Sequence, residues 1–160
     1  MLETIFGAAK DQLFMQEALV QAQYAATIDE VPIGAILVNP EGEIVGRGYN
    51  SVERDCTQRS HAEGIAIEQA SKKLGDWRLA GHWLYVTLEP CTMCMGLIKL
   101  SRLDGVVYGA ASPLFGFRLD NKDHLWVYKK DAFSIIEGVE KEASAAVLKK
   151  FFHKKRKKDE

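Results

Sequence analysis

Two cysteines, a histidine and a glutamate in this sequence have the types and spacing of a catalytic metal site. Cys91 and Cys94 form a Pro-Cys-x-x-Cys run, and His61 and Glu63 form a His-x-Glu run earlier in the chain. One imidazole and two thiolates give Zn²⁺ three protein ligands and leave a fourth position for water, which is typical of catalytic zinc sites. Glu63 stands two residues from a ligand and could move the protons of that water.

Each of these residues has another possible role when it is taken alone. A Cys-x-x-Cys pair can be a thioredoxin-like redox pair, and a glutamate in a first helical turn can simply compensate the helix dipole. A structural zinc site would need a fourth ligand; Cys56 could supply it, although its loop has no second cysteine or histidine at ligand spacing. The combination His-x-Glu and Pro-Cys-x-x-Cys matches the signature of zinc deaminases. We therefore predict a catalytic site with Zn²⁺ as its cofactor.

Hydrophobic periodicity indicates the elements that must position this site. Helices are expected over residues 9–27, 61–74, 91–101 and from about 140 onward. Strands are expected over 33–38 and 44–49, joined as a hairpin, and over 83–88, 105–110 and 133–136. Residues 111–132 are not assigned, and "HLWVYKK" within them reads as a strand or a short helix. This order predicts an α/β fold, a mixed sheet with helices on both faces.

The second expected helix carries a carboxylate on its inward face. Ser60 is predicted to be its N-cap, and Ile67, Ala70 and Leu74 form an apolar stripe with Glu63 one step before them. A buried carboxylate is costly unless the site needs it. This helix and the one that starts at Cys91 both follow strand-like segments, so we expect their N-termini to meet at one edge of the sheet.

Length and composition describe one globular domain over residues 1–160. Hydrophobic residues make up 47% of the chain and charged residues 27%, and no apolar run is long enough to span a bilayer. The N-terminus lacks the basic region of a signal peptide. Three cysteines are too few for a secreted disulfide scaffold, so a cytoplasmic location is expected.

A basic segment closes the chain at about residues 140–160. Although the net charge is −1, five consecutive basic residues occupy positions 154–158. A solvated helix end and a phosphate-contacting arm are equally compatible with this run alone.

The chain resembles the bacterial tRNA-specific adenosine deaminases of the cytidine deaminase-like superfamily. The resemblance covers about residues 14–110 and, weakly, 134–156, and it is carried by "EVPIGAILV", "RGYN", "HAEGIAIEQA", "LYVTLEPCTMC" and "SRLDGVVYGA". It implies a three-layer α/β/α fold with a mixed five-stranded sheet, a homodimer, and hydrolytic conversion of the wobble adenosine of a tRNA anticodon to inosine. It also implies one Zn²⁺ per subunit, held by His61, Cys91 and Cys94, with Glu63 as the proton shuttle.

The same resemblance assigns substrate contacts. Asn50 matches the family's base-binding asparagine, although it could equally close the second strand as a turn residue. The other substrate-binding positions are Val31, Pro32, Ala62 and Pro90. On the C-terminal helix, the possible contacts to the anticodon stem-loop are Phe151, Phe152, Lys154, Lys155 and Arg156.

One segment departs from the family pattern. After "VVYGA" the family continues with an acidic residue, a lysine and a glycine/serine-rich turn, but this chain reads "ASPLFGFRLDNKDHLW". Arg118 and Lys122 could replace the missing RNA contacts, or the loop could serve another partner. The alternative function is a free nucleobase or nucleotide deaminase, of guanine or cytosine type, on the same zinc site. A non-catalytic zinc or redox module is the alternative from a different class.

Overall fold

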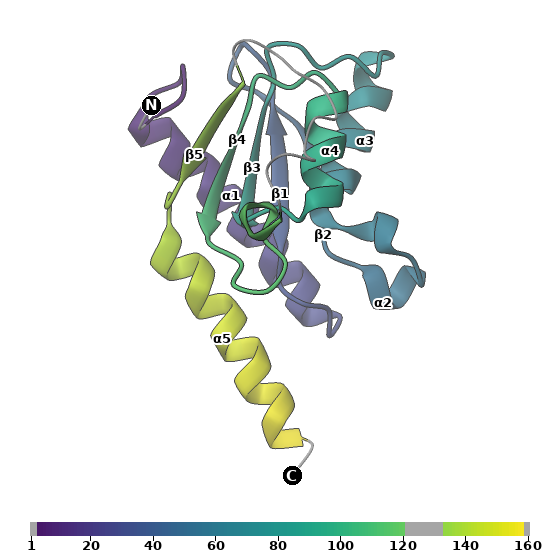
Figure 1. Cartoon of the computed structure of the whole chain (residues 1–160), viewed down its shortest axis with the longest axis vertical. Coiled ribbons are helices and arrows are strands. Elements are labelled where there is room, and N and C mark those ends of the chain that lie inside the picture. The colour runs from purple at the N-terminus through teal and green to yellow at the C-terminus, as the bar shows by residue number, and fades with distance from the viewer. Residues whose placement is uncertain (1–2, 121–132, 159–160) are drawn as a thin grey trace.

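A five-stranded mixed sheet forms the centre of the protein, whose computed structural model describes residues 3–120 and 133–158 (Figure 1). The strands are β1 (Gly34–Val38), β2 (Ile44–Tyr49), β3 (Trp83–Leu88), β4 (Gly105–Ala110) and β5 (Ser134–Glu137). The helices are α1 (Ala8–Thr27), α2 (Val52–Asp55), α3 (Ala62–Leu74), α4 (Thr92–Leu100) and α5 (Lys141–Lys158), with short 3₁₀ turns η1 (Gln58–Ser60) and η2 (Phe117–Leu119).

The order of strands across the sheet is β2-β1-β3-β4-β5. Strand β1 pairs antiparallel with both β2 and β3, whereas β3, β4 and β5 run parallel to one another. The predicted mixed sheet and the predicted hairpin of β1 and β2 are therefore confirmed. Because β3 and β4 are parallel neighbours, the chain must cross over between them, and α4 makes this connection.

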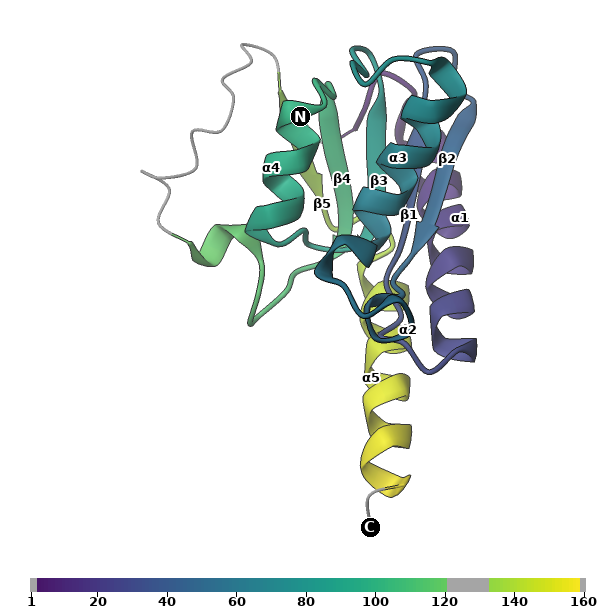
Figure 2. The same cartoon turned by 90° about the vertical axis from the view of Figure 1, so that its right-hand side faces the viewer.

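Helices cover both faces of the sheet, and the alternation of side chains along the strands separates two cores. Ala35 and Leu37 of β1 face α3 and α4, while Ile36 and Val38 face α1. Helix α1 buries the predicted stripe of Phe14, Ala18, Ala22 and Ala25. Helix α5 packs against β4 and α1, and its second half projects beyond the end of the sheet (Figures 1 and 2). The predicted three-layer architecture is confirmed.

Two details of the predicted second helix are wrong. Ser60 is not its N-cap, because Ser60 ends the 3₁₀ turn η1 and His61 takes the cap position with extended backbone angles. Leu74 does not belong to the inward stripe: it is 55% exposed in the last turn, whereas Ile67 and Ala70 are buried as predicted. The polar loop before this helix also contains α2, which was not predicted.

The loop after β4 is only partly within the described residues. Residues 111–120 include η2, while "HLWVYKK" and Lys122 lie outside the described ranges. Over residues 3–120 and 133–158, none of the helices combines the length and the hydrophobicity needed to cross a lipid bilayer.

Candidate active site

His61, Cys91 and Cys94 come together at the start of α3 and α4. Their possible ligand atoms all lie within 4.8 Å of one another. The Nδ1 atom of His61 is 3.7 Å from Sγ of Cys91 and 3.4 Å from Sγ of Cys94. Zn–S and Zn–N bonds of about 2.3 and 2.1 Å in tetrahedral geometry place two ligands about 3.6 Å apart. The donor set and its spacing therefore fit a tetrahedral zinc ion.

The fold brings these donors together through two helix starts at one end of the sheet. His61 is the N-cap of α3 and Cys91 is the N-cap of α4, which begins directly after β3. The first turn of α3 approaches β2 closely: a Cβ atom at Gly48 would lie 2.2 Å from the carbonyl oxygen of Ala62. Only glycine permits this approach, so the "RGYN" segment helps to set the position of His61.

The two thiols of the metal-free site differ in acidity. Hydrogen bonds from Cys94 and His61 lower the pKa of Cys91 to about 4, so its thiolate predominates at neutral pH. The hydrogen bond with Cys91 and burial raise the pKa of Cys94. The hydrogen bond with Cys91 also raises the pKa of His61. Because zinc binds thiolate and neutral imidazole, metal binding must release the proton of the Cys94 thiol, and it opposes protonation of His61.

Glu63 is buried beside this cluster, as predicted. Its side chain lies in the first turn of α3 and is 4% exposed. Burial raises the pKa of Glu63, and the nearby His61 acts in the opposite direction. A carboxyl group whose pKa is raised by burial suits general acid–base catalysis better than a solvated one.

The predicted base-binding residues Asn50 and Val31 are in direct contact. Nδ2 of Asn50 donates a hydrogen bond to the Val31 carbonyl oxygen at 3.2 Å, and the Asn50 backbone N–H donates to Ile33. Asn50 and Pro32 are buried, and Val31 is half-buried. Ala62 and Pro90, both buried, adjoin the donors in sequence. The structure thus joins Asn50 to the segment before β1.

Glu30, which was not predicted as a site residue, supports the same region. Its buried carboxylate accepts hydrogen bonds from the backbone N–H groups of Glu53 at 3.2 Å and Arg54 at 2.7 Å. These groups belong to the first turn of α2, so Glu30 ties α2 to the segment that carries Val31. No local sequence pattern reveals this contact, since the partners are more than twenty residues apart.

A second unpredicted carboxylate, Glu89, holds the loop that departs from the family pattern. Glu89 is buried and accepts hydrogen bonds from the backbone N–H groups of Ser112 at 3.0 Å and Arg118 at 3.2 Å. Gly116 lies against it, and a Cβ atom there would be 2.5 Å from the carboxylate. The Phe117 N–H also donates to the Pro90 carbonyl oxygen at 2.9 Å. The loop is therefore attached to the residues just before Cys91.

Arg118, considered as a replacement RNA contact, already has partners within the fold. Its guanidinium pairs with Glu137 and lies over the rings of Tyr108 and Phe117, at 5.3 and 5.7 Å from their centroids. An RNA contact through this side chain would have to form alongside the pair with Glu137.

The basic end of α5 lies beside the segment that carries Val31. Lys155 pairs with Asp29 at 2.6 Å, and its ammonium group lies 5.6 Å from the centroid of the Phe151 ring. Phe151 is half-buried and Phe152 is 44% exposed. The Lys155–Asp29 pair therefore ties the C-terminal part of α5 to the segment before β1, and none of these α5 residues belongs to the described cluster of possible metal ligands.

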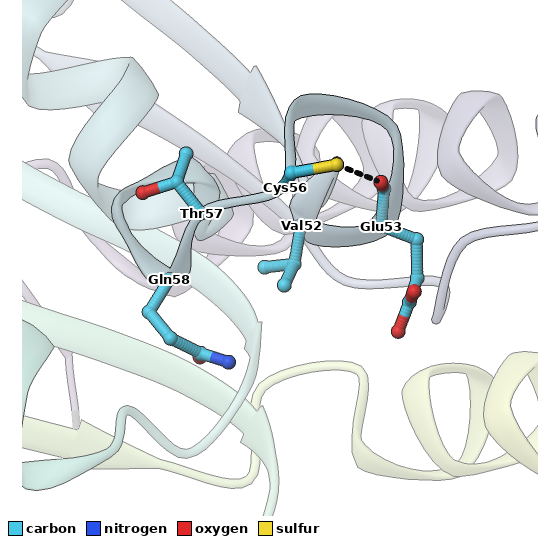
Figure 3. A pocket seen from close by; sticks show the side chains of 5 residues that line it. All are labelled: Val52, Glu53, Cys56, Thr57 and Gln58. Carbon is cyan, nitrogen blue, oxygen red and sulfur yellow. Dashed lines mark hydrogen bonds between the residues drawn. The ribbon is translucent and has the colours of Figure 1, made fainter.

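Cys56 is separate from the zinc donors. It is a free, exposed cysteine whose thiol donates to the Glu53 carbonyl oxygen at 3.5 Å, and it is not in the described cluster of possible metal ligands. Figure 3 shows it in an open pocket of about 350 Å³, lined by Val52, Glu53, Cys56, Thr57 and Gln58. This placement argues against Cys56 as a fourth ligand.

Comparison with known proteins agrees with this geometry. Residues 8–110 match the cytidine and deoxycytidylate deaminase zinc-binding region. The chain belongs to this zinc-binding deaminase family. The match includes His61, Glu63, Cys91 and Cys94, and with the donor set described above it confirms Zn²⁺ as the predicted cofactor.

Individual relatives show which members of this family the chain resembles. The chain is 41% identical to a tRNA-specific adenosine deaminase of Bacillus subtilis, over 93% of this chain and 92% of that protein. It is 52% identical to a chloroplastic tRNA(adenine(34)) deaminase of Arabidopsis thaliana over 66% of this chain, although it spans only 8% of that much longer protein. A solved structure from a study of A-to-I editing by tRNA:A34 deaminases is 37% identical, with a TM-score of 0.75 over 85% of this chain and 99% of that one. The predicted resemblance to the bacterial tRNA-specific adenosine deaminases is confirmed.

Proposed function

We propose that the protein catalyses the hydrolytic deamination of the wobble adenosine of a tRNA anticodon, which yields inosine and ammonia. The observation that carries this proposal is the cluster of His61, Cys91 and Cys94 beside a buried Glu63, in a chain similar over nearly its whole length to a tRNA-specific adenosine deaminase. The same relatives favour this function over deamination of a free nucleobase or nucleotide.

In the proposed mechanism, Glu63 moves protons between water and the base. A zinc ion would be held by His61, Cys91 and Cys94 and would supply Lewis acidity that makes water a better nucleophile. Glu63 takes a proton from the water that attacks C6 of adenine and delivers a proton to N1. It then passes the second proton to the departing amine, which leaves as ammonia. Such general acid–base help accelerates a reaction by about 10²–10⁴-fold.

Asn50 is proposed to orient the adenine base. Its hydrogen bond to Val31 fixes the side-chain amide against the segment of Val31 and Pro32, so the three can form one wall of the base site. Ala62 and Pro90 are proposed to line the site next to the donors. A positioned amide can hydrogen-bond the base edge, which is how flipped bases are recognised.

The proposal is tested by incubating the protein with an anticodon stem-loop that carries adenosine at the wobble position. Inosine in the RNA, detected by mass spectrometry after digestion, is the expected result. Free guanine and cytosine are incubated in parallel. Deamination of a free base without inosine in the RNA would keep the chemistry and refute the tRNA substrate.

The basic end of α5 is proposed to contact RNA phosphates. Lys154, Arg156 and Lys157 are exposed on the part of α5 that projects beyond the sheet (Figure 2). Replacing all three by alanine is expected to raise KM for the stem-loop and to flatten the plot of log KM against log salt by about one unit per lost phosphate contact. An unchanged slope would contradict the assignment. Lys73→Ala, in the last turn of α3 away from the site, is the control.

A homodimer is proposed from an exposed apolar surface on α4. Met93, Leu97 and Leu100 lie at helical spacing on its outer face and are 49%, 39% and 46% exposed. The neighbouring loop adds Leu114 and Phe115, at 76% and 75%. Large apolar side chains exposed along one helix face are typical of an interface. Leu97→Glu is expected to convert a dimer into a monomer in sedimentation equilibrium, and a wild-type protein that sediments as one chain would refute the dimer.

A cytoplasmic location is proposed, since tRNA and the reducing conditions that keep thiols free are found there. All three cysteines are free, and two of them are needed as thiolates. Finding the protein in an extracellular fraction of intact cells would contradict this location.

A further inference from the structure

Gln58 contacts the ring nitrogen of His61 that faces away from the cysteines. The distance from Oε1 of Gln58 to Nε2 of His61 is 3.1 Å, while Nδ1 of His61 faces both sulfur atoms. A histidine that binds a metal through Nδ1 carries its hydrogen on Nε2. Nε2–H can then donate to the Gln58 oxygen, and this hydrogen bond favours the tautomer that zinc requires.

The loop that carries Gln58 is closed on itself by hydrogen bonds. The backbone N–H of Ser51 donates to the Ser60 carbonyl oxygen at 3.0 Å. The carboxylate of Asp55 accepts hydrogen bonds from the hydroxyl groups of Ser51 and Ser60, both at 2.8 Å. The side chain of Thr57 accepts the N–H of Arg59 at 3.2 Å and caps η1. These contacts fix the backbone on both sides of Gln58.

This closure matters because Gln58 is exposed. A single exposed hydrogen bond contributes little when both partners must be ordered to form it. Here Gln58 is the first residue of η1 and His61 directly follows η1, so their backbones are already held three residues apart. Ordering the one glutamine side chain is then the main entropic cost of the contact. Figure 3 shows Gln58 next to Thr57, among the residues that line the pocket.

We infer that Gln58 is a positioning residue for the zinc site, which acts by accepting a hydrogen bond from Nε2–H of His61. Partners of this kind orient the metal-binding imidazole, and their loss typically weakens metal affinity by about 10–100-fold. The inference rests on the metal site of the proposed function, but it does not depend on the identity of the substrate.

The test is a measurement of zinc affinity by competition with a chromophoric chelator under reducing conditions. Gln58→Ala is expected to raise the Kd for zinc by about 10–100-fold. Gln58→Glu keeps an acceptor oxygen in place and is expected to hold affinity at or above the wild-type value. Gln23→Ala, an exposed glutamine of α1 on the other face of the sheet, is the matched control and should have no effect.

Long-range ¹H–¹⁵N NMR of the zinc-loaded protein provides a second readout. We expect a protonated Nε2 of His61 in the wild-type protein, with a slowed hydrogen exchange that Gln58→Ala abolishes. A Kd for Gln58→Ala within twofold of wild type would overturn the inference. An equal loss of affinity in Gln58→Glu would also overturn it, because the acceptor would then not be the cause. Because neither readout uses RNA, failure of the tRNA assay leaves this test intact.

Discussion

Glu63→Gln is expected to keep zinc bound while losing nearly all deaminase activity. The substitution preserves the size of a side chain that is 4% exposed in the first turn of α3, so packing around it should change little. The amide cannot take a proton from water or deliver one to the base. Losing general acid–base catalysis costs about 10²–10⁴-fold in rate. Inosine formation under saturating stem-loop, with zinc content measured on the same sample, checks both expectations.

Glu68→Gln provides the matched control for this prediction. Glu68 lies on the same helix and pairs at its surface with Lys72, at 2.6 Å. An exposed pair of this kind contributes at most about 1 kcal/mol to the free energy of unfolding, so Glu68→Gln should stay folded and retain full activity. Normal turnover by Glu63→Gln would show that another group moves the protons. Loss of zinc in the same variant would mean that Glu63 supports the metal site, and would leave its role in proton transfer without support.

The elements of this fold were predictable because their signals are local. The stripe of Phe14, Ala18 and Ala22 repeats at helical steps, and each such repeat can bury only one face of a helix. The breaker-rich turn before β2 likewise predicts a hairpin from a few adjacent residues. The zinc donors could also be predicted from the sequence, because their residue types and short spacings indicate the chemistry without knowledge of distant contacts.

The side chains that support the site were not predictable, because their contacts join residues far apart in the sequence. Glu89 accepts hydrogen bonds from Ser112 and Arg118, which lie more than twenty residues later in the chain. Glu30 reaches α2 across a similar separation. Polar residues at such positions are usually solvated, and only the packed structure shows that these two carboxylates are buried. Gln58 is nearer to His61, but a glutamine three residues before a histidine has no established signature.

Capping shows how a functional requirement can override a local preference. Serine is a favoured N-cap, and Ser60 precedes the helix, yet His61 occupies the cap position without a side-chain cap hydrogen bond. In α4 the same position belongs to Cys91, again without a side-chain cap. Both helices place a zinc donor where a capping side chain would otherwise stand. The donor side chains are thereby directed beyond the helix ends, toward each other.

Cys94→Ala is expected to lose nearly all bound zinc, and with it all measurable deamination. Removing one of three protein ligands leaves an imidazole and a single thiolate, too few for a tightly held zinc ion. Cys56→Ala is the matched control, because Cys56 is exposed and bonds to the Glu53 carbonyl oxygen away from the cluster. Zinc content by atomic absorption and inosine formation are measured for both variants, purified without chelator.

This pair of variants also separates the zinc enzyme from a redox module. The acidic thiol of Cys91 beside Cys94 would suit disulfide exchange as well as metal binding. A redox pair, however, has no need of an imidazole within 3.7 Å of both sulfur atoms, nor of a buried glutamate next to it. Wild-type protein that holds no zinc and readily forms a Cys91–Cys94 disulfide would support the redox alternative. Zinc that disappears in Cys94→Ala and persists in Cys56→Ala would exclude it, because only a metal ligand explains that difference.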